Sequence, residues 1–335
     1  MKNPEWLTNV KKFEKPEIKK SVFQMLDSII PFVALLVCMF VMMDHGVSYW
    51  LVMPLIILTS CFMVRIFIIM HDCSHFSYFR SKQACNIVGF LSGLIIFMPF
   101  YEFQHSHAIH HATSGILEKR GIGDVWTLTV EEYRTMGKFK KFICNGFRSP
   151  YTFLTIGPLV QFLYISRMPS ISSKKKQVFH IFLVDGFMLL TMAIAYFTNQ
   201  FGHYLLILAP MFFIAQDVGI ILFFVQHQFE DVQWTDNNHW DPIKVALSGS
   251  SFYKLPRVLQ WITGNIGFHH IHHLKPGIPN YKLNQCFNEI PELRNIKPVK
   301  MFEGFKGLSY KLWDDESGSM VKISNTRKMP QFVTK

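Results

Sequence analysis

Ten of the fifteen histidines in the 335-residue chain fall in three short groups. The first group is a pair at i and i+4, and the other two share the pattern His-x-x-His-His. The eight residues of these patterns are His71, His75, His107, His110, His111, His269, His272 and His273. On a helix these spacings place side chains on one face, so each group can direct two or three imidazoles at one point.

Eight imidazoles in a repeated spacing need a common partner. Protonated rings would repel one another, and neutral rings would each need a hydrogen-bond partner. A metal ion provides that partner, and eight ligands fit two ions with about four imidazoles each. Because imidazole binds Zn, Cu, Fe and Ni, the spacing alone leaves the identity of the metal open.

The segments that must position these groups are strongly apolar. Half of the residues are hydrophobic, including 33 Phe and 17 Met. Crossing a bilayer takes roughly 20 apolar residues. Four runs are long enough: 25–43, 48–70, 178–197 and 204–226. The first run lacks the cleavage site of a signal peptide and a second run follows at once, so we expect it to be a retained span.

The sequence thus predicts an all-α integral membrane protein with two helical hairpins, folded as a single domain over residues 1–335. Two shorter apolar stretches, 86–100 and 151–165, are too short to be clear spans. If residues 86–100 crossed the bilayer, the first two histidine groups would lie on opposite sides. We therefore expect both stretches to be interfacial or re-entrant helices.

The net charge of +11 carries a signal about topology. The short turns 44–47 and 198–203 contain no Lys or Arg, whereas the other connecting segments are rich in both. The positive-inside rule then places both termini, residues 71–177 and residues 227–335 in the cytoplasm, together with the histidine groups. A nucleic-acid interface would need a basic groove with stacking aromatic residues, and no such cluster occurs.

The six cysteines show no close-paired spacing, so we expect neither disulfides nor thiolate metal sites.

The three histidine groups, in this order and next to these spans, resemble the histidine boxes of the membrane fatty acid desaturase family. The resemblance covers about residues 48–281. The segments HAIHHATSGILEKRGIGDVWTLTVEEY and NIGFHHIHHLKPGIPNY are similar to the acyl-lipid branch, and in particular to phospholipid desaturases of the bacillus type.

This resemblance implies that the eight histidines bind two iron ions. It implies an O2-dependent oxidoreductase in the cell membrane that introduces a cis double bond into a phospholipid acyl chain. Delta-5 is a candidate position for that bond, which the boxes themselves do not fix.

The electrons should come from a separate protein. The chain has no haem-binding His-Pro-Gly-Gly segment and no cysteine set for an iron–sulfur cluster. A basic cytoplasmic surface would attract an acidic donor such as a ferredoxin or a flavodoxin.

His227 is a candidate ninth ligand outside the boxes. It follows the fourth apolar run, at a depth that matches His71 after the second run. Related desaturases take a further ligand or a water-bridging residue from the corresponding helix end. The competing interpretation is a histidine that interacts with the negative end of a helix dipole. His203, at the other end of the same run, is the natural control.

Five further residues are expected to support the ligands. Asp72, Asp124 and Asn265 lie next to or near the boxes. A ligating imidazole usually donates its other N–H to a carboxylate or carbonyl, although either aspartate could instead cap a helix. His105 and His270 fall outside the shared spacing, so they should contact the ligands from outside or lie at the surface.

Two other functions share part of this pattern. Lipid or carotenoid hydroxylases and ketolases carry similar boxes, and analysis of the product would distinguish them. A metal transporter or sensor would place its ligands within the spans, near the midplane of the bilayer. The four apolar runs contain a single histidine, His180, which disfavours a transporter.

Overall fold

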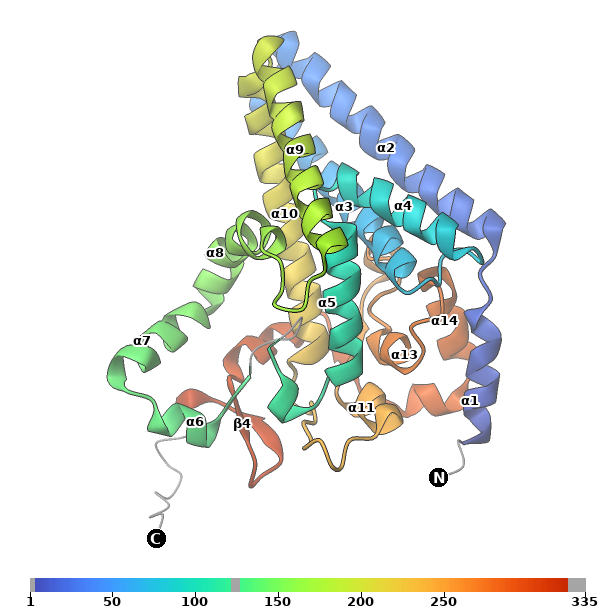
Figure 1. Cartoon of the computed structure of the whole chain (residues 1–335), viewed down its shortest axis with the longest axis vertical. Coiled ribbons are helices and arrows are strands. Elements are labelled where there is room, and N and C mark those ends of the chain that lie inside the picture. Colours follow the sequence, from blue (N-terminus) through green and yellow to red (C-terminus); the bar gives the residue numbers. More distant parts are fainter. Residues whose placement is uncertain (1–3, 122–126, 325–335) are drawn as a thin grey trace.

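Four long helices form the upper half of the molecule, and shorter helices and small sheets form the lower half (Figure 1). This computed structural model describes residues 4–121 and 127–324. The long helices are α2 (Ile18–Asp44), α3 (Tyr49–Ser74), α9 (Lys175–Phe197) and α10 (Phe201–His227). All four are long and apolar enough to cross a membrane, which confirms the predicted spans.

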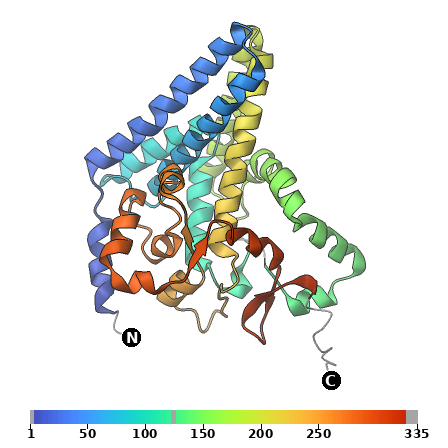
Figure 2. The ribbon, with the colours of Figure 1, turned by 180° about the vertical axis from the view of Figure 1, so that it is seen from behind.

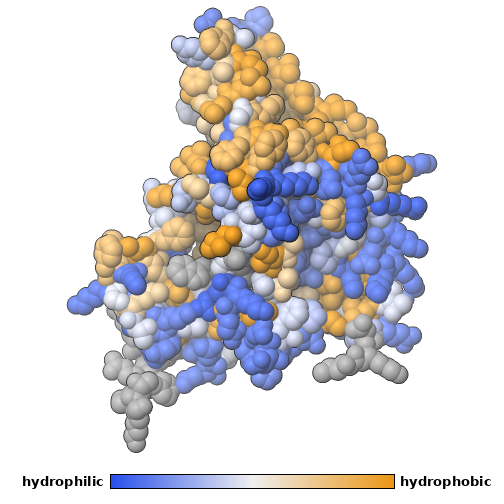
Figure 3. Space-filling view, viewed as in Figure 1, coloured by the Kyte–Doolittle hydropathy of each residue, from blue (hydrophilic) through white to orange (hydrophobic). Residues whose placement is uncertain are grey.

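The long helices form two hairpins whose turns meet at one end of the molecule (Figures 1 and 2). Across these turns, Gln200 Nε2 donates to Asp44 Oδ1 over 2.8 Å. Apolar side chains cover this half of the surface, whereas hydrophilic side chains gather on the other half (Figure 3). An apolar surface of this extent is typical of a protein surrounded by lipid.

Between the hairpins, α4 (Lys82–Ile95) and α5 (Phe100–Thr113) are separated by a 110° bend. Glycines allow the two helices to come close at this bend. A Cβ atom at Gly89 would lie 2.4 Å from the ring of Phe100, and one at Gly93 would lie 2.6 Å from the backbone oxygen of Met98. The stretch that we expected to be interfacial or re-entrant is therefore part of a sharply bent helix pair, whose second helix, α5, carries the second histidine box.

The second ambiguous stretch forms α8 (Pro150–Leu163), which packs along α10. The rings of Phe153 and Phe224 are 4.9 Å apart, and those of Phe162 and Phe212 are 4.8 Å apart. The shorter helices around it and in the lower half are α1 (Glu5–Val10), α6 (Val130–Thr135), α7 (Lys138–Phe147), α11 (Pro242–Ser248), α12 (Arg257–Ile262), α13 (His269–Leu274) and α14 (Asn280–Glu289). The 3-10 helices are η1 (Lys11–Glu14), η2 (Leu117–Lys119), η3 (Ile165–Arg167), η4 (Pro291–Asn295) and η5 (Gly304–Ser309).

Two small sheets depart from the purely helical expectation. Their strands are β1 (Leu128–Thr129), β2 (Phe252–Lys254), β3 (Pro298–Lys300), β4 (Leu312–Asp314) and β5 (Ser319–Val321). One sheet has the order β1-β4-β5, in which β1 and β4 are parallel and β4 and β5 are antiparallel. The other sheet joins β2 and β3 in parallel. Strands of two or three residues are too short to show an alternating sequence pattern, so the sequence could not reveal them.

Three charged residues within the spans, Asp27, Arg65 and Asp185, form ion pairs, whereas Asp217 Oδ1 of α10 is buried without a hydrogen-bond partner. Arg65 of α3 forms an ion pair with Asp27 of α2 at 2.8 Å, and it also donates to the backbone oxygen of Trp261. Asp185 of α9 forms an ion pair with Arg167 at 3.0 Å. The hydrogen bond from Arg65 to Trp261 and the ion pair between Arg167 and Asp185 connect the long helices to α12 and η3, which lie outside them.

Candidate metal centre

The ends of four helices bring nine imidazoles together. His71 lies in the last turn of α3, and His75 is the residue that caps it. The second box occupies the final two turns of α5, His227 is the last residue of α10, and the third box forms most of α13. Each box is helical, as its spacing predicts. The C-terminal ends of α3, α5 and α10 lie next to α13.

The potential ligand atoms separate into two groups. In group one, the ligand atoms of four residues all lie within 4.8 Å of one another: His71, His75, His107 and His272. In group two the same limit holds for His110, His227, His269 and His273. Each of the two His-x-x-His-His boxes therefore contributes histidines to both groups. This is possible because residues at positions i, i+3 and i+4 lie on one helix face but point in slightly different directions.

Within group one, His107 Nε2 lies 3.0 Å from His71 Nε2. His111 borders this group, since its Nε2 lies 3.2 Å from His107 Nε2 and 3.0 Å from His272 Nε2. The ring of His111 also stacks on that of His273 in group two, with centroids 4.2 Å apart. His111 therefore lies where the two groups meet.

Within group two, His227 Nε2 lies 2.9 Å from His269 Nε2 and 3.2 Å from His110 Nε2. His273 Nε2 lies 3.1 Å from His269 Nε2 and 3.3 Å from His110 Nε2. The structure thus places His227 among the box histidines, at the same spacing from them as they have from one another. Whether it binds metal remains a prediction.

These distances fit metal coordination better than hydrogen bonding. A neutral imidazole has one N–H, so a ring nitrogen with two neighbouring nitrogens cannot satisfy both contacts with one hydrogen. Two imidazole nitrogens about 2.1 Å from one ion and a right angle apart lie about 3 Å from each other. His75 Nε2 is buried without a hydrogen-bond partner, as expected for an atom that awaits a ligand.

Burial keeps these imidazoles in the form that binds metal. Removal from water, together with the neighbouring imidazoles, holds the pKa of seven box histidines well below the usual range: His75, His107, His110, His111, His269, His272 and His273. A neutral imidazole offers a nitrogen lone pair, whereas a protonated one does not. The donor set is therefore suited to cations that accept nitrogen ligands.

Phenylalanine rings from three helices flank the two groups. The ring of Phe103 stacks on His107 with centroids 5.0 Å apart, and the ring of Phe67 lies 5.4 Å from that of Phe103. In group two, the ring of Phe223 lies 5.0 Å from His227. These rings make an apolar border to the centre on the side of the long helices.

Of the expected supporting residues that the structure describes, Asp72 is the one that forms a hydrogen bond with a ligand. Its Oδ1 lies 3.3 Å from His71 Nδ1, and the carboxylate is buried. Asn265 Nδ2 donates to the backbone oxygen of Asn280 instead, over 3.3 Å. Asp124 lies outside the described residues.

The two histidines outside the shared spacing point away from both groups. His105 Nε2 lies 2.8 Å from Ser172 Oγ, near the surface. His270 is fully buried, and its ring lies against Phe252 and Phe287 rather than among the imidazoles of the centre. Among the described residues, sequence reasoning missed Asn280, which binds Asp72 from 208 positions away, too far for any local pattern to reveal.

Comparison with known proteins adds the family context. The family model described as fatty acid desaturase matches residues 48–303. A fatty acid desaturase of Bacillus subtilis is 38% identical over 318 residues, which cover 95% of this chain and 90% of the relative. An sn-1 acyl-lipid omega-3 desaturase (ferredoxin) of Nostoc is 25% identical, covering 89% of this chain and 80% of the relative. An sn-1 oleoyl-lipid 12-desaturase of Picosynechococcus is 23% identical, covering 73% and 70%.

Proposed function

The chain belongs to the fatty acid desaturase family, and on that premise we propose that it is a di-iron enzyme that uses O2 to introduce a cis double bond into an acyl chain of a membrane phospholipid. The observation that carries the proposal is the convergence of nine imidazoles in two groups, beside an apolar border of phenylalanine rings. Membership of the family makes the protein an oxidoreductase that acts on fatty acyl chains.

The chemistry explains why such a centre is needed. No side-chain acid or base can remove hydrogen from unactivated carbons, so the reaction requires a cofactor that activates O2. Two bound irons would supply that activation. In the net reaction, two hydrogens leave adjacent carbons of the acyl chain, the donor supplies two electrons and the solvent supplies two protons, so that O2 is reduced to two molecules of water. The proposed ligands are His71, His75, His107, His111 and His272 for one iron, and His110, His227, His269 and His273 for the other.

The residues of the chain itself bind, orient and exclude water. Burial keeps the seven box imidazoles other than His71 neutral, so each of these seven has a nitrogen lone pair available for a metal. Phe67, Phe103 and Phe223 form an apolar surface between the metals and the long helices. An acyl chain entering from the membrane would contact these rings, and its position along them would decide which carbons face the metals.

We propose that the centre faces the cytoplasm. The turns 44–47 and 198–203 lie together at one end of the long helices and contain no Lys or Arg. The histidines lie at the opposite end, where the connecting segments are basic. This asymmetry supports an orientation with both termini inside the cell.

The names of relatives and the box segments support a proposal for the electron donor and for the position of the double bond. The names of the omega-3 desaturases of Nostoc and Synechocystis specify ferredoxin, which supports a small acidic donor such as a ferredoxin or a flavodoxin. Delta-5 rests on the resemblance of the box segments to phospholipid desaturases of the bacillus type.

Product analysis tests the proposal directly. The chain is expressed in a host whose lipids lack double bonds at the expected position, and the double bonds are located by mass spectrometry of derivatised fatty acids. We expect a new monounsaturated acyl chain in the phospholipid fraction, absent with a His272→Ala variant. A hydroxylated or oxo product would instead assign the chain to the related hydroxylases or ketolases, and an unchanged lipid profile with iron-loaded protein would refute the proposal.

A further inference from the structure

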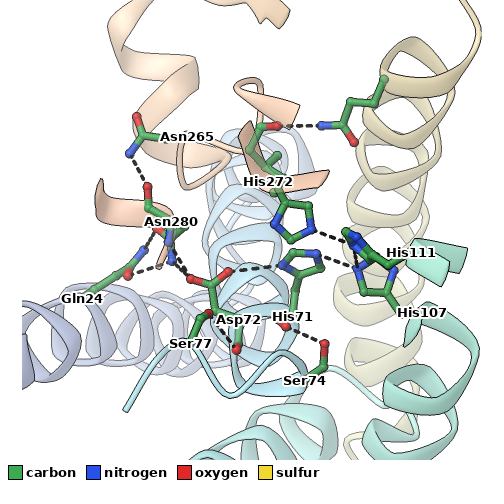
Figure 4. A network of polar contacts seen from close by, with 12 residues as sticks. Gln24, His71, Asp72, Ser74, Ser77, His107, His111, Asn265, His272 and Asn280 are labelled. Carbon is green, nitrogen blue, oxygen red and sulfur yellow. Dashed lines mark hydrogen bonds and ion pairs between the residues drawn. The ribbon is translucent and has the colours of Figure 1, made fainter. Parts of the chain in front are cut away.

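A buried carboxylate lies directly behind one of the proposed ligands. Asp72 is 2% exposed, and its Oδ1 is 3.3 Å from His71 Nδ1 (Figure 4). The opposite ring nitrogen, His71 Nε2, faces His107 in group one. When Nδ1 carries the hydrogen and donates it to the carboxylate, Nε2 keeps its lone pair for a metal. Asp72 therefore favours the form of His71 whose Nε2 can bind a metal ion.

The second oxygen of this carboxylate is held by Asn280. Asp72 Oδ2 accepts from the backbone N of Asn280 at 2.7 Å and from its Nδ2 at 2.8 Å. Asn280 is the first residue of α14, whose N-terminus carries partial positive charge. A buried carboxylate is costly unless it is paired and hydrogen-bonded. Asn280 supplies both hydrogen bonds to this oxygen.

The amide of Asn280 is itself fixed by Gln24 of α2. Gln24 Nε2 donates to Asn280 Oδ1 at 2.8 Å, and Asn280 Nδ2 lies 3.2 Å from Gln24 Oε1. Asn280 is 1% exposed, so water cannot replace these partners. A rotated amide would turn its oxygen towards the oxygen of Asp72, which is unfavourable. Gln24, Asn280, Asp72 and His71 therefore form a chain of oriented contacts from the first long helix to the metal centre (Figure 4).

We propose that Asn280 is a positioning residue of the metal centre: acting through Asp72, it holds His71 Nε2 towards group one and thereby sets how tightly that group retains its metal. This inference rests on the proposed function, because it requires group one to bind metal. It also connects α14, which follows the third box, and α2, the first long helix, to the centre.

A purely structural role for Asn280 is the alternative to exclude. The first turn of α14 also holds the N-terminal segment through the two residues that follow Asn280. Tyr281 Oη accepts from the backbone N of Glu17 at 2.8 Å and lies 3.1 Å from Ser21 Oγ. Lys282 forms an ion pair with Glu17 at 2.9 Å. Loss of Asn280 could therefore loosen this contact between α14 and the N-terminal segment without any specific effect on the metal.

Tyr281→Phe provides the matched control, because it removes hydrogen bonds from the same turn of α14 but leaves the contacts of Asp72 in place. The full-length parent, Asn280→Ala and Tyr281→Phe are purified in detergent and stripped of metal. Binding of Fe2+ is then titrated without oxygen, and thermal unfolding of each metal-free protein is recorded. These readouts do not depend on turnover.

We expect Asn280→Ala to bind one of the two irons about 10- to 100-fold more weakly than the parent, the range usual for loss of a residue that orients a ligand. Tyr281→Phe should bind both irons as the parent does, although its metal-free form should unfold at a lower temperature. Gln24→Ala is a milder change that leaves the contacts of Asp72 in place. It should lower the affinity for the same iron to a smaller extent. With Asp72→Ala as background, Asn280→Ala should have little further effect on iron binding.

Three results would overturn the inference. The first is an Asn280→Ala variant that binds both irons as tightly as the parent. The second is a loss of affinity in Tyr281→Phe that matches the loss in Asn280→Ala. The third is a full effect of Asn280→Ala in the Asp72→Ala background. A parent that binds no iron would instead contradict the proposed function, so the two failures can be distinguished.

Discussion

Removal of the His227 imidazole should empty one metal position and leave the other. His227 is 2% exposed and contributes one of the four ligand atoms of group two. Loss of a residue that only orients a ligand typically weakens metal binding by 10- to 100-fold. Loss of the ligand itself should exceed the upper end of that range, which corresponds to about 2.7 kcal/mol or more. Group one contains no atom of His227 and, with His111 beside it, keeps all of its imidazoles.

We therefore expect His227→Ala to fall from two irons per chain towards one and to lose its desaturase activity, because O2 activation requires both ions. The assay is elemental analysis of purified protein, combined with quantification of unsaturated acyl chains in the host. His203→Ala is the matched control, since His203 lies at the other end of α10 and contacts Asp44 and Gln200. It should keep the iron and the activity of the parent.

The reasoning would be refuted if His227→Ala kept both irons and full activity. In that case the short distances around His227 would reflect packing near a helix end, and eight histidines would form the whole ligand set. Loss of both irons in His203→Ala as well would show that any change in α10 disturbs the centre.

Three further predictions follow from the same structure. His272→Ala should abolish activity, whereas His105→Ala should retain a measurable part of it, because His105 contacts Ser172 rather than either group; equal inactivation in a product assay would contradict this. Arg65→Ala should lower the free energy of unfolding by about 1.5–3 kcal/mol, the usual contribution of hydrogen bonds to a charged group, because Arg65 is buried whereas Asp27 stays partly exposed to water; a denaturation experiment that found under about 0.5 kcal/mol would show that the pair is unimportant. In a background without native cysteines, a cysteine at exposed Lys119 should resist an impermeant thiol reagent on intact cells while one at exposed His45 reacts, and the reverse pattern would invert the proposed topology.

Local spacing and hydropathy were enough to predict the elements that build the centre. Runs of apolar residues located the four long helices to within about two turns, because crossing a bilayer demands length and hydrophobicity that few other structures need. The i, i+3 and i+4 spacing placed His107, His110 and His111 on one helix, as the structure has them. The depth of His227 relative to His71 indicated that it would lie near the boxes, and its Nε2 is 2.9 Å from that of His269.

Contacts between distant segments could not be predicted in the same way. Asp27 and Arg65 are both visible as charged residues in apolar runs, but many pairings satisfy such charges equally well. Asn280 carries no sequence signal, since its role depends on where α14 begins relative to Asp72. The division of each patterned box between two groups depends on how α5 and α13 are rotated against each other, which packing determines and spacing does not.

The central claim is that two groups of imidazoles each hold an iron ion. Anomalous diffraction at the iron absorption edge, from crystals of enzyme shown to be active, tests it most directly. We expect two peaks per chain, one among His71, His75, His107 and His272, and the other among His110, His227, His269 and His273. A single peak, or peaks that appear at the zinc edge and not at the iron edge in an active preparation, would contradict the di-iron account.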